Sequence, residues 1–153
     1  MLGALFYSAF VWTSTPAYCV KCHEIQPAYQ SWKTSSHRVN SRGVVAECKD
    51  CHLPPSDDVG SFILAKGKHT ALDVFAHLAQ EEYDRQAMRL KAASGISNAA
   101  CQKCHSDLLY PPMSRGAMLA HRSMLYPREG YEKRCLDCHE NLVHRQRSLF
   151  ASE

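Results

Sequence analysis

The sequence predicts a small, mainly α protein made of short helices and long loops, with an apolar helix at the N-terminus and one longer amphipathic helix in the middle. Two observations predict this fold class. All eight cysteines fall into four copies of the pattern Cys-x-x-Cys-His, two near each end of the chain. Between the two pairs, residues 61–94 form the longest segment free of both this pattern and proline.

The chain opens with MLGALFYSAFVW, twelve residues without a charged side chain. As a helix they span about 18 Å, against about 30 Å of bilayer hydrocarbon, so they are too short to cross a bilayer alone. A signal-peptide core, a buried helix and the outer half of a membrane anchor are the alternatives. No basic region of the kind that opens signal peptides is present, and Trp12 followed by TSTP fits a helix leaving a membrane interface. We therefore expect residues 1–15 to be a partial transmembrane anchor.

The four cysteine motifs predict four covalently bound haem c groups. In each motif two thiols three positions apart can both reach the vinyl groups on one porphyrin edge, and the adjacent histidine then binds the iron. The thioether cysteines are Cys19, Cys22, Cys48, Cys51, Cys101, Cys104, Cys135 and Cys138, and the proximal histidines are His23, His52, His105 and His139.

Other uses of these cysteines are less compatible with the sequence. A redox pair or a zinc site uses CxxC without needing a following histidine, and here every pair has one. No thiol is left over for a disulfide framework. Four haems in 153 residues imply that the porphyrins form much of the interior. The net charge of +3, from 18 basic and 15 acidic residues, is too small to indicate a nucleic-acid partner.

Residues 61–94 are predicted to form the amphipathic helix, with Ser61 as N-cap and Gly95 as the stop. One side carries the apolar residues Leu64, Ala71, Leu72, Phe75 and Leu78. The opposite side carries the stripe Lys66, His69, Asp73 and His77. The stripe is either a solvated face or the polar wall of a pocket beside a substrate or haem. Gly67 weakens a helix, which fits a close approach to the backbone.

Five histidines lie outside the motifs, and they are the main candidates for the second iron ligands, with Met113, Met118 and Met124 as further candidates. The five histidines are His37, His69, His77, His121 and His144. Iron in an electron-transfer haem usually takes a second histidine or a methionine. Five candidates for four irons are close to what four bis-histidine haems need, although the count does not assign them.

The chain resembles the membrane-anchored tetrahaem quinol dehydrogenases of the NapC/NirT family, in particular the small NrfH-like subunits that feed multihaem nitrite reductases. The resemblance is carried by TPAYCVKCHEI, SSHRVNSRGVVAECKDCHLPP, AKGKHTALDVF, ACQKCH and CLDCHENLVH. These segments cover most of the chain, and they match in order and spacing as well as in number.

The resemblance also implies roles for individual residues. His37 corresponds to the distal ligand of the fourth-motif haem, and His144 to that of the second-motif haem. Lys66 and Asp73 correspond to the lysine and aspartate that line the quinol pocket beside the first haem. Lys66 and Asp73 also lie on the same stripe of the predicted helix. Lys66 is thus expected to donate to the quinol head group, and Asp73 to accept its proton.

The distal ligands of the first and third haems are not assigned by the resemblance. The family commonly has a methionine two residues after the first motif histidine, whereas this chain has Ile25, which cannot bind metal. The distal side of the first haem is then either open near Asp73 or filled by His69 or His77. The third haem takes its distal ligand either from a partner protein, as in related complexes, or from His121.

The resulting expectation is a cytochrome anchored in a bacterial cytoplasmic membrane that oxidises quinol and relays electrons through its haems to a periplasmic multihaem oxidoreductase. That partner, nitrite reductase or hydroxylamine-oxidoreductase-like, makes the chain part of a hetero-oligomer that also contacts membrane lipid. Residues 16–153 form the periplasmic domain, with dihaem halves at about 16–60 and 95–153 joined by the helix of about 61–94. The alternatives are a relay subunit without its own quinol site and a small enzyme acting on a nitrogen or sulfur compound at an open iron.

Overall fold

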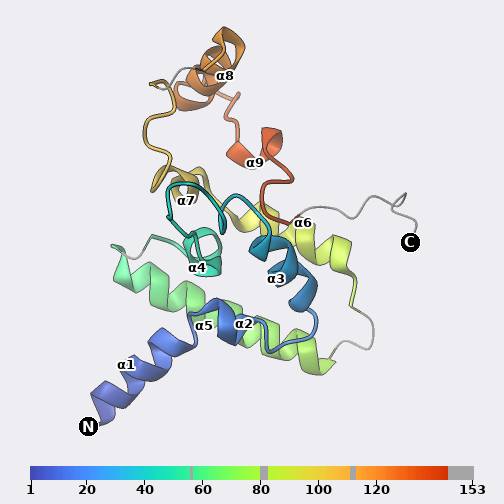
Figure 1. Cartoon of the computed structure of the whole chain (residues 1–153). Helices are drawn as coiled ribbons and strands as arrows, with labels where there is room; N and C mark the ends of the chain where they lie inside the picture. Colours follow the sequence, from blue (N-terminus) through green and yellow to red (C-terminus); the bar gives the residue numbers. More distant parts are fainter. Residues whose placement is uncertain (56, 80–82, 111–112, 145–153) are drawn as a thin grey trace.

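The structure is a computed structural model of the whole chain, and it describes residues 1–55, 57–79, 83–110 and 113–144. Within these ranges the regular secondary structure is helical, without strands, as the sequence predicts. The helices are α1 (Leu2–Trp12), α2 (Pro16–Cys19), α3 (Gln26–Lys33), α4 (Cys48–His52), α5 (Val59–Ala79), α6 (Arg85–Gly95), α7 (Asn98–Gln102), α8 (Arg115–Leu125) and α9 (Cys135–Cys138). The molecule is elongated, with α1 at one end and α8 at the other (Figure 1).

The hydroxyl-rich segment after α1 ends that helix and starts the next one. The Ser14 hydroxyl donates to the main-chain oxygen of Phe10 at 2.7 Å, which satisfies a carbonyl that the helix end leaves unpaired. The Thr15 side chain then caps α2 by accepting from the amide of Tyr18. Pro16 occupies the first turn of α2, where its missing amide is not needed. The apolar helix therefore leads directly into the first cysteine motif.

The predicted helix of residues 61–94 is instead two helices, α5 and α6. Helix α5 begins earlier than predicted because Asp58, not Ser61, occupies the cap: its carboxylate accepts from the amide of Ser61 at 3.1 Å. Asp84 caps a separate start for α6 by accepting from the amides of Gln86 and Ala87. Residues 80–82 of the predicted helix lie outside the described ranges. Gly95, predicted as the stop, is the last residue of α6.

Each cysteine motif lies on or directly after a short helix. In the second and fourth motifs an aspartate precedes the second cysteine and fixes the helix start. Asp50 accepts from the amide of Glu47 at 2.8 Å, and Asp137 accepts from the amide of Arg134 at 2.9 Å. Because both thiols of these motifs then lie on one helical turn, their spacing is set locally by the sequence.

Among the described side chains, Trp32 is the only large apolar one that is buried, at 7% exposure. Its indole donates to the main-chain oxygen of Ala46 at 2.8 Å, and the ring of Tyr29 lies 5.5 Å away. The buried hydroxyl of Ser35 donates to the carbonyl of Trp32. This cluster fixes α3 against the segment that leads into α4. A chain of this length and apolar content ordinarily buries a larger core of its own.

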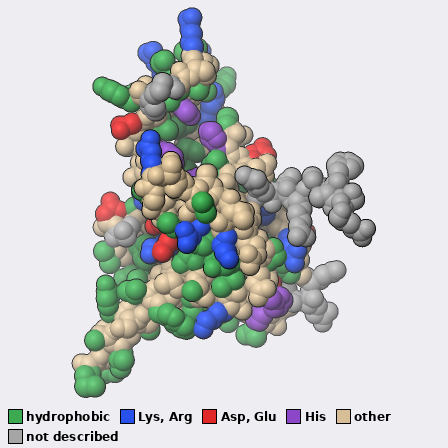
Figure 2. Space-filling view, in the orientation of Figure 1, with side chains coloured by type: hydrophobic (Ala, Val, Ile, Leu, Met, Phe, Trp, Pro, Cys, Tyr) green, Lys and Arg blue, Asp and Glu red, His purple; other side chains and the backbone are tan. Residues whose placement is uncertain are grey.

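Hydrophobic side chains instead gather on the surface over α1 and along the neighbouring part of α5 (Figure 2). On α1, Leu2, Phe6 and Val11 are exposed. On α5, Leu64 and Leu78 are more than three quarters exposed, at 76% and 78%. In the described part of the chain, no helix combines the length and the apolar character needed to cross a membrane.

Candidate haem-ligand sites

Each motif histidine faces one histidine from outside the motifs. The distances between ring centres are 5.5 Å for His23 and His77, 6.1 Å for His52 and His144, 6.2 Å for His105 and His37, and 6.3 Å for His139 and His121. All nine histidines lie within the described residues, and these four pairs use eight of them. The ninth, His69, is exposed on α5.

Three of these pairs, those of the second, third and fourth motifs, fit an iron between their rings. Imidazole nitrogens bind first-row metals at about 2 Å, so two histidines on opposite sides of one ion place their ring centres roughly 6 Å apart. The pairs of the second, third and fourth motifs have this separation. In the third and fourth pairs, the Nδ1 atoms of His37 and His121 are buried without a hydrogen-bond partner. When bound, a haem at each motif supplies a one-electron carrier.

The second pair shows how the fold prepares a ligand. Nδ1 of His144 lies 3.1 Å from the main-chain oxygen of Ala28. A carbonyl oxygen only accepts, so Nδ1 carries the proton and the other ring nitrogen stays free to bind metal. Burial lowers the pKa of His52 to about 4, and burial also lowers the pKa of His144. Both rings are therefore neutral near pH 7, which is the form that binds metal.

The structure exchanges the partners of His37 and His121 relative to the expectation. The resemblance implied that His37 serves the fourth motif, but it faces His105 of the third motif. His121 was the expected ligand from within this chain for the third-motif haem, but its ring faces His139 of the fourth motif.

Packing of the short helices explains this exchange. Helix α4 lies against α7, so the loop carrying His37 just before α4 reaches the third motif. Helix α8 is bound to the segment before α9 by a 3.0 Å hydrogen bond from Lys133 to Ser123, which places His121 beside the fourth motif. The resemblance rests on the order and spacing of residues in the sequence. The exchange depends on which short helices pack together, and the sequence order does not give that.

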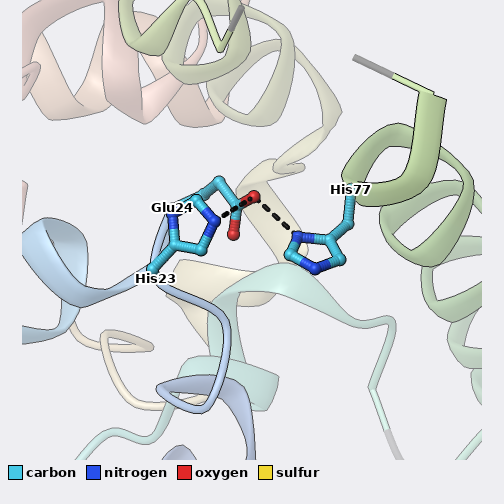
Figure 3. Close-up of side chains that lie close together, drawn as sticks. All are labelled: His23, Glu24 and His77. Atoms are coloured by element: carbon cyan, nitrogen blue, oxygen red, sulfur yellow. Dashed lines mark hydrogen bonds and ion pairs between the residues drawn. The ribbon is translucent and has the colours of Figure 1, made fainter. Parts of the chain in front are cut away.

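At the first motif three side chains meet (Figure 3). A carboxylate oxygen of Glu24 lies 3.2 Å from Nε2 of His23 and 2.7 Å from Nδ1 of His77. The Glu24 side chain is 13% exposed, and its second oxygen is buried without a hydrogen-bond partner. Hydrogen bonds from its own amide and from His77 hold the pKa of Glu24 below its usual range. Sequence reasoning did not single out Glu24, and its position after the motif was the only available signal.

Lys66, predicted to face a quinol head group, is held by the end of α1. Its ammonium group donates to the carbonyl of Phe10 at 2.6 Å, to the Thr13 hydroxyl at 2.8 Å and to the Ser14 hydroxyl at 2.5 Å. An ammonium group has three N–H donors, so all three are engaged. Burial lowers the pKa of Lys66. Lys66 therefore joins α5 to α1 as well as bordering the space between them.

Asp73 lies on α5 beside the first motif. Its charge contributes to raising the pKa of the Cys22 thiol, after burial and the charge of Glu24. Partial desolvation raises the pKa of Asp73 itself, and nearby His69 opposes this shift. The Asp73 carboxyl group is thus both close to the first motif and easier to protonate than an ordinary aspartate.

An apolar groove of about 680 Å³ runs between α1 and α5. Its walls carry Phe6, Phe10, Ile63, Val74 and Leu78, with the stem of Lys66 at one border. Gly67 also lines it, and a β-carbon at Gly67 would meet no atom within 4 Å. The glycine predicted to permit a close approach therefore faces open space in the groove.

The two cysteine motifs near each end of the chain also lie next to each other in space. A hydrogen bond with Cys48 of the second motif lowers the pKa of the Cys19 thiol in the first motif to about 7. Burial, with a further contribution from Cys135 of the fourth motif, raises the pKa of Cys101 in the third to about 11. The first and second motifs therefore touch, and so do the third and fourth.

The second and third motifs adjoin as well. The ammonium group of Lys103 donates to the main-chain oxygen of Asp50 at 2.9 Å, across the contact of α4 and α7. Burial and the charge of Asp50 raise the pKa of Cys51, and Cys104 of the third motif adds a smaller contribution. The four motifs thus form one continuous series from α2 to α9.

Comparison with known proteins agrees with this description. Residues 1–149 match the NapC/NirT cytochrome c family, N-terminal region. The chain is 32% identical over 150 residues to the cytochrome c-type protein TorC of Escherichia coli K12, covering 86% of this chain and 35% of TorC. It is 29% identical over 143 residues to the tetraheme c-type cytochrome CymA of Shewanella oneidensis, covering 86% of this chain and 76% of CymA.

A solved structure shares the fold. The cytochrome c nitrite reductase NrfHA complex, bound to the HQNO inhibitor, contains a chain that superposes with a TM-score of 0.60 at 23% identity. The match covers 96% of this chain and 86% of that one. The chain spans about a third of the length of TorC, so the likeness to TorC concerns that part alone.

Proposed function

Because the chain belongs to the NapC/NirT cytochrome c family, we propose that it oxidises quinol beside its first motif and relays electrons to a periplasmic multihaem oxidoreductase. The observation that carries this proposal is the junction of three features at α5. The apolar groove, the Asp73 carboxyl group and the first cysteine motif all adjoin that helix. A quinol has an apolar tail and a polar head, and it needs both kinds of surface next to an electron acceptor.

The apolar groove fits the apolar tail of a quinol. Its lining is aromatic and aliphatic, and it opens on the exposed apolar face that α1 and α5 share. Lys66 lies at its polar border, where exchange of one hydroxyl partner frees an N–H for a quinol oxygen. A small molecule with a long apolar portion is the class of ligand that such a groove favours.

Asp73 fits the polar head group of a quinol, because its carboxylate can accept a proton. Oxidation of a quinol releases two protons, and a carboxylate within hydrogen-bond reach serves as the base that accepts one of them. The raised pKa of Asp73 brings its proton affinity closer to neutral pH, where a general base is most effective. Its position next to the thiols of the first motif keeps proton and electron transfer in one place.

The proposed location follows from the apolar surface. Residues 1–15 belong to a membrane anchor, Trp12 lies at the interface, and residues 16–153 lie in the periplasm. The ammonium group of Lys21 lies 4.4 Å from the centre of the Trp12 ring, an arrangement found where an aromatic belt meets the charged headgroup layer. The periplasmic part is made of two dihaem halves, and it docks with a nitrite reductase or hydroxylamine-oxidoreductase-like partner in a hetero-oligomer.

The test is reduction by quinol. Detergent-solubilised holoprotein is mixed anaerobically with a menaquinol analogue, and the haem absorption bands are followed by stopped flow. Fast reduction that HQNO inhibits is the expected result. Full reduction by dithionite without any reduction by quinol would contradict the proposal.

That second result would support the relay alternative, in which electrons arrive from another subunit. One observation favours it. All three N–H donors of Lys66 are already used by Phe10 on α1 and by Thr13 and Ser14 just after it, so the residue has a structural role that needs no quinol. In this alternative Lys66 and Asp73 are surface groups of a larger multihaem complex.

A further inference from the structure

The ring that faces His52 of the second motif comes from a segment without helical structure. His144 follows α9 by six residues, and residues 139–144 form turns and bends. The segment runs from α9 towards α3 and α6 (Figure 1). Because no helix holds His144 in place, its position depends on bonds to other parts of the chain.

Helix α3 holds this segment at two points. The Ser31 hydroxyl donates to the main-chain oxygen of Val143 at 2.7 Å, although the two residues are 112 positions apart. One turn earlier on α3, the main-chain oxygen of Ala28 accepts from Nδ1 of His144 at 3.1 Å. Ala28 and Ser31 are three residues apart, so they lie on the same side of the helix. Two successive residues, Val143 and His144, are therefore bound to one side of α3.

The same helix is also fixed to the segment that carries the other ring. Next to Ser31, the indole of Trp32 donates to the main-chain oxygen of Ala46 at 2.8 Å. Ala46 lies just before α4, the helix that ends at His52. Trp32 is buried, at 7% exposure, which makes this attachment a firm one. Helix α3 thus joins the segment leading into His52 to the segment that ends in His144.

We propose that Ser31 is a positioning residue for the second haem, because its hydroxyl holds His144 at the separation from His52 that an iron between the rings requires. The ring centres of this pair are 6.1 Å apart. Ser31 acts on the ligand through the main chain of Val143 and is not itself a ligand. This role does not depend on quinol oxidation, and it holds for a quinol dehydrogenase and for a relay subunit alike.

A second side chain holds the beginning of the same segment, and it limits the effect of losing Ser31. The guanidinium group of Arg89 on α6 donates to the main-chain oxygen of Glu140 at 3.3 Å and to the side-chain oxygen of Asn141 at 2.7 Å. These contacts lie three and four residues before His144, whereas Ser31 binds the residue directly before it. Without the Ser31 hydroxyl, His144 should stay on the iron but be held less firmly.

Two measurements report how firmly the ring is held. The g values of a low-spin ferric haem depend on the angle between its two imidazole planes, which is 35° for His52 and His144. An external ligand such as cyanide binds the iron only when His144 leaves. Loss of one hydrogen bond of about 1 kcal/mol should favour that exchange about fivefold.

The experiment compares Ser31→Ala with the matched control Thr34→Ala in the full-length holoprotein. Thr34 also carries a hydroxyl at α3, but it is exposed and donates back to the main-chain oxygen of Ser31 at 3.1 Å. Haem content is measured first, and both variants should keep four haems per chain. A third variant, His144→Ala, identifies the second haem, because its low-spin signal should disappear from the electron paramagnetic resonance spectrum.

In Ser31→Ala, that identified signal should shift or broaden, and the other low-spin signals should stay as in the wild type. The signal should also be lost at about fivefold lower cyanide concentration. Thr34→Ala should match the wild type in both measurements. An unchanged signal with unchanged cyanide binding in Ser31→Ala would overturn the proposal, and so would equal changes in Thr34→Ala.

A second pair of variants separates the hydroxyl from the volume of the side chain. Threonine and valine have nearly the same shape, and only threonine has a hydroxyl donor. Ser31→Thr should therefore keep the wild-type signal, and Ser31→Val should reproduce the change expected for Ser31→Ala. If Ser31→Ala does not accumulate with four haems, this pair decides the question. Equal spectra and equal cyanide binding in the two variants would overturn the positioning role.

Discussion

The ammonium nitrogen of Lys66 lies 2.6 Å from the main-chain oxygen of Phe10, although the two residues are 56 positions apart in the chain. The bond satisfies a carbonyl in the last turn of α1 and places a positive charge at the negative end of that helix. It also fixes α1 against α5 at the border of the groove. Lys66, together with the ring of Phe62 5.9 Å from that of Phe10, therefore helps to set the direction in which α1 leaves α5.

Replacing Lys66 by Met should loosen this junction. The variant keeps the apolar stem but loses the three hydrogen bonds, which should cost about 1–2 kcal/mol locally because the site is partly exposed. Amide hydrogen exchange in residues 13–15 should accelerate about tenfold. Lys68→Met, on the same helix and exposed, should leave this exchange unchanged. Equal exchange in the two variants would remove the structural role of Lys66.

Replacing Asp73 by Asn should slow quinol-driven reduction by about 10²-fold or more, the usual contribution of a general base. Reduction by dithionite should stay as in the wild type. In the wild type the quinol-driven rate should rise with pH through the raised pKa of Asp73, because only the carboxylate accepts a proton. The variant should lack that rise. Parallel loss with both reductants would instead indicate a damaged fold.

The same substitution should affect stability in a defined direction. Asp73 has a higher pKa folded than unfolded, so its contribution is fully favourable below the unfolded pKa and is lost as pH rises through the folded value. At neutral pH the wild type therefore carries a desolvated charge that Asp73→Asn removes. Thermal unfolding should show the variant at least as stable as the wild type at pH 7, with the difference vanishing in acid.

Filling the groove should block quinol without disturbing the haem ligands. Gly67→Trp places a large ring where a β-carbon has no atom within 4 Å, so the fold should tolerate it. Quinol-driven reduction should fall at least tenfold, a loss of about 1.4 kcal/mol in binding. Gly116→Trp is the control, since Gly116 lies on α8 at the other end of the molecule and is equally open. Unchanged reduction in Gly67→Trp would place the quinol elsewhere.

The exchange of His37 and His121 can be tested by removing one haem at a time. His37→Ala should produce one high-spin haem. In a background with Cys101→Ser and Cys104→Ser, which removes the third haem, the same change should produce none. A high-spin haem in that background would return His37 to the fourth motif, as the resemblance implied.

The helical class was predictable from the sequence because it depends on local patterns. The second motif, Cys48–His52, coincides with α4, and Pro16 lies in the first turn of α2, where proline is common. The break between α5 and α6 was not predicted, because residues 68–94 contain no proline or glycine that would mark it. Only the capping geometry of Asp84 marks the new start.

Tertiary contacts were harder to predict for a physical reason. The acceptors of Lys66 lie on α1 and just after it, and the carboxylate partner of His77 lies before α3. The helical period placed Lys66 and His77 on one stripe of α5, but it could not predict which residues of other segments contact that stripe. The pairing of His37 with His105 likewise depends on the packing of two short helices whose faces are too small to read from periodicity.

The contact of α4 with α7 joins the two halves of the molecule. The motifs adjoin in a single series, and the two halves meet where Lys103 of the third motif bonds to Asp50 of the second. In the proposed relay, electrons that pass from one half to the other cross this junction. A displacement of the Lys103–Asp50 contact would therefore slow transfer between the halves and leave transfer within each half unchanged.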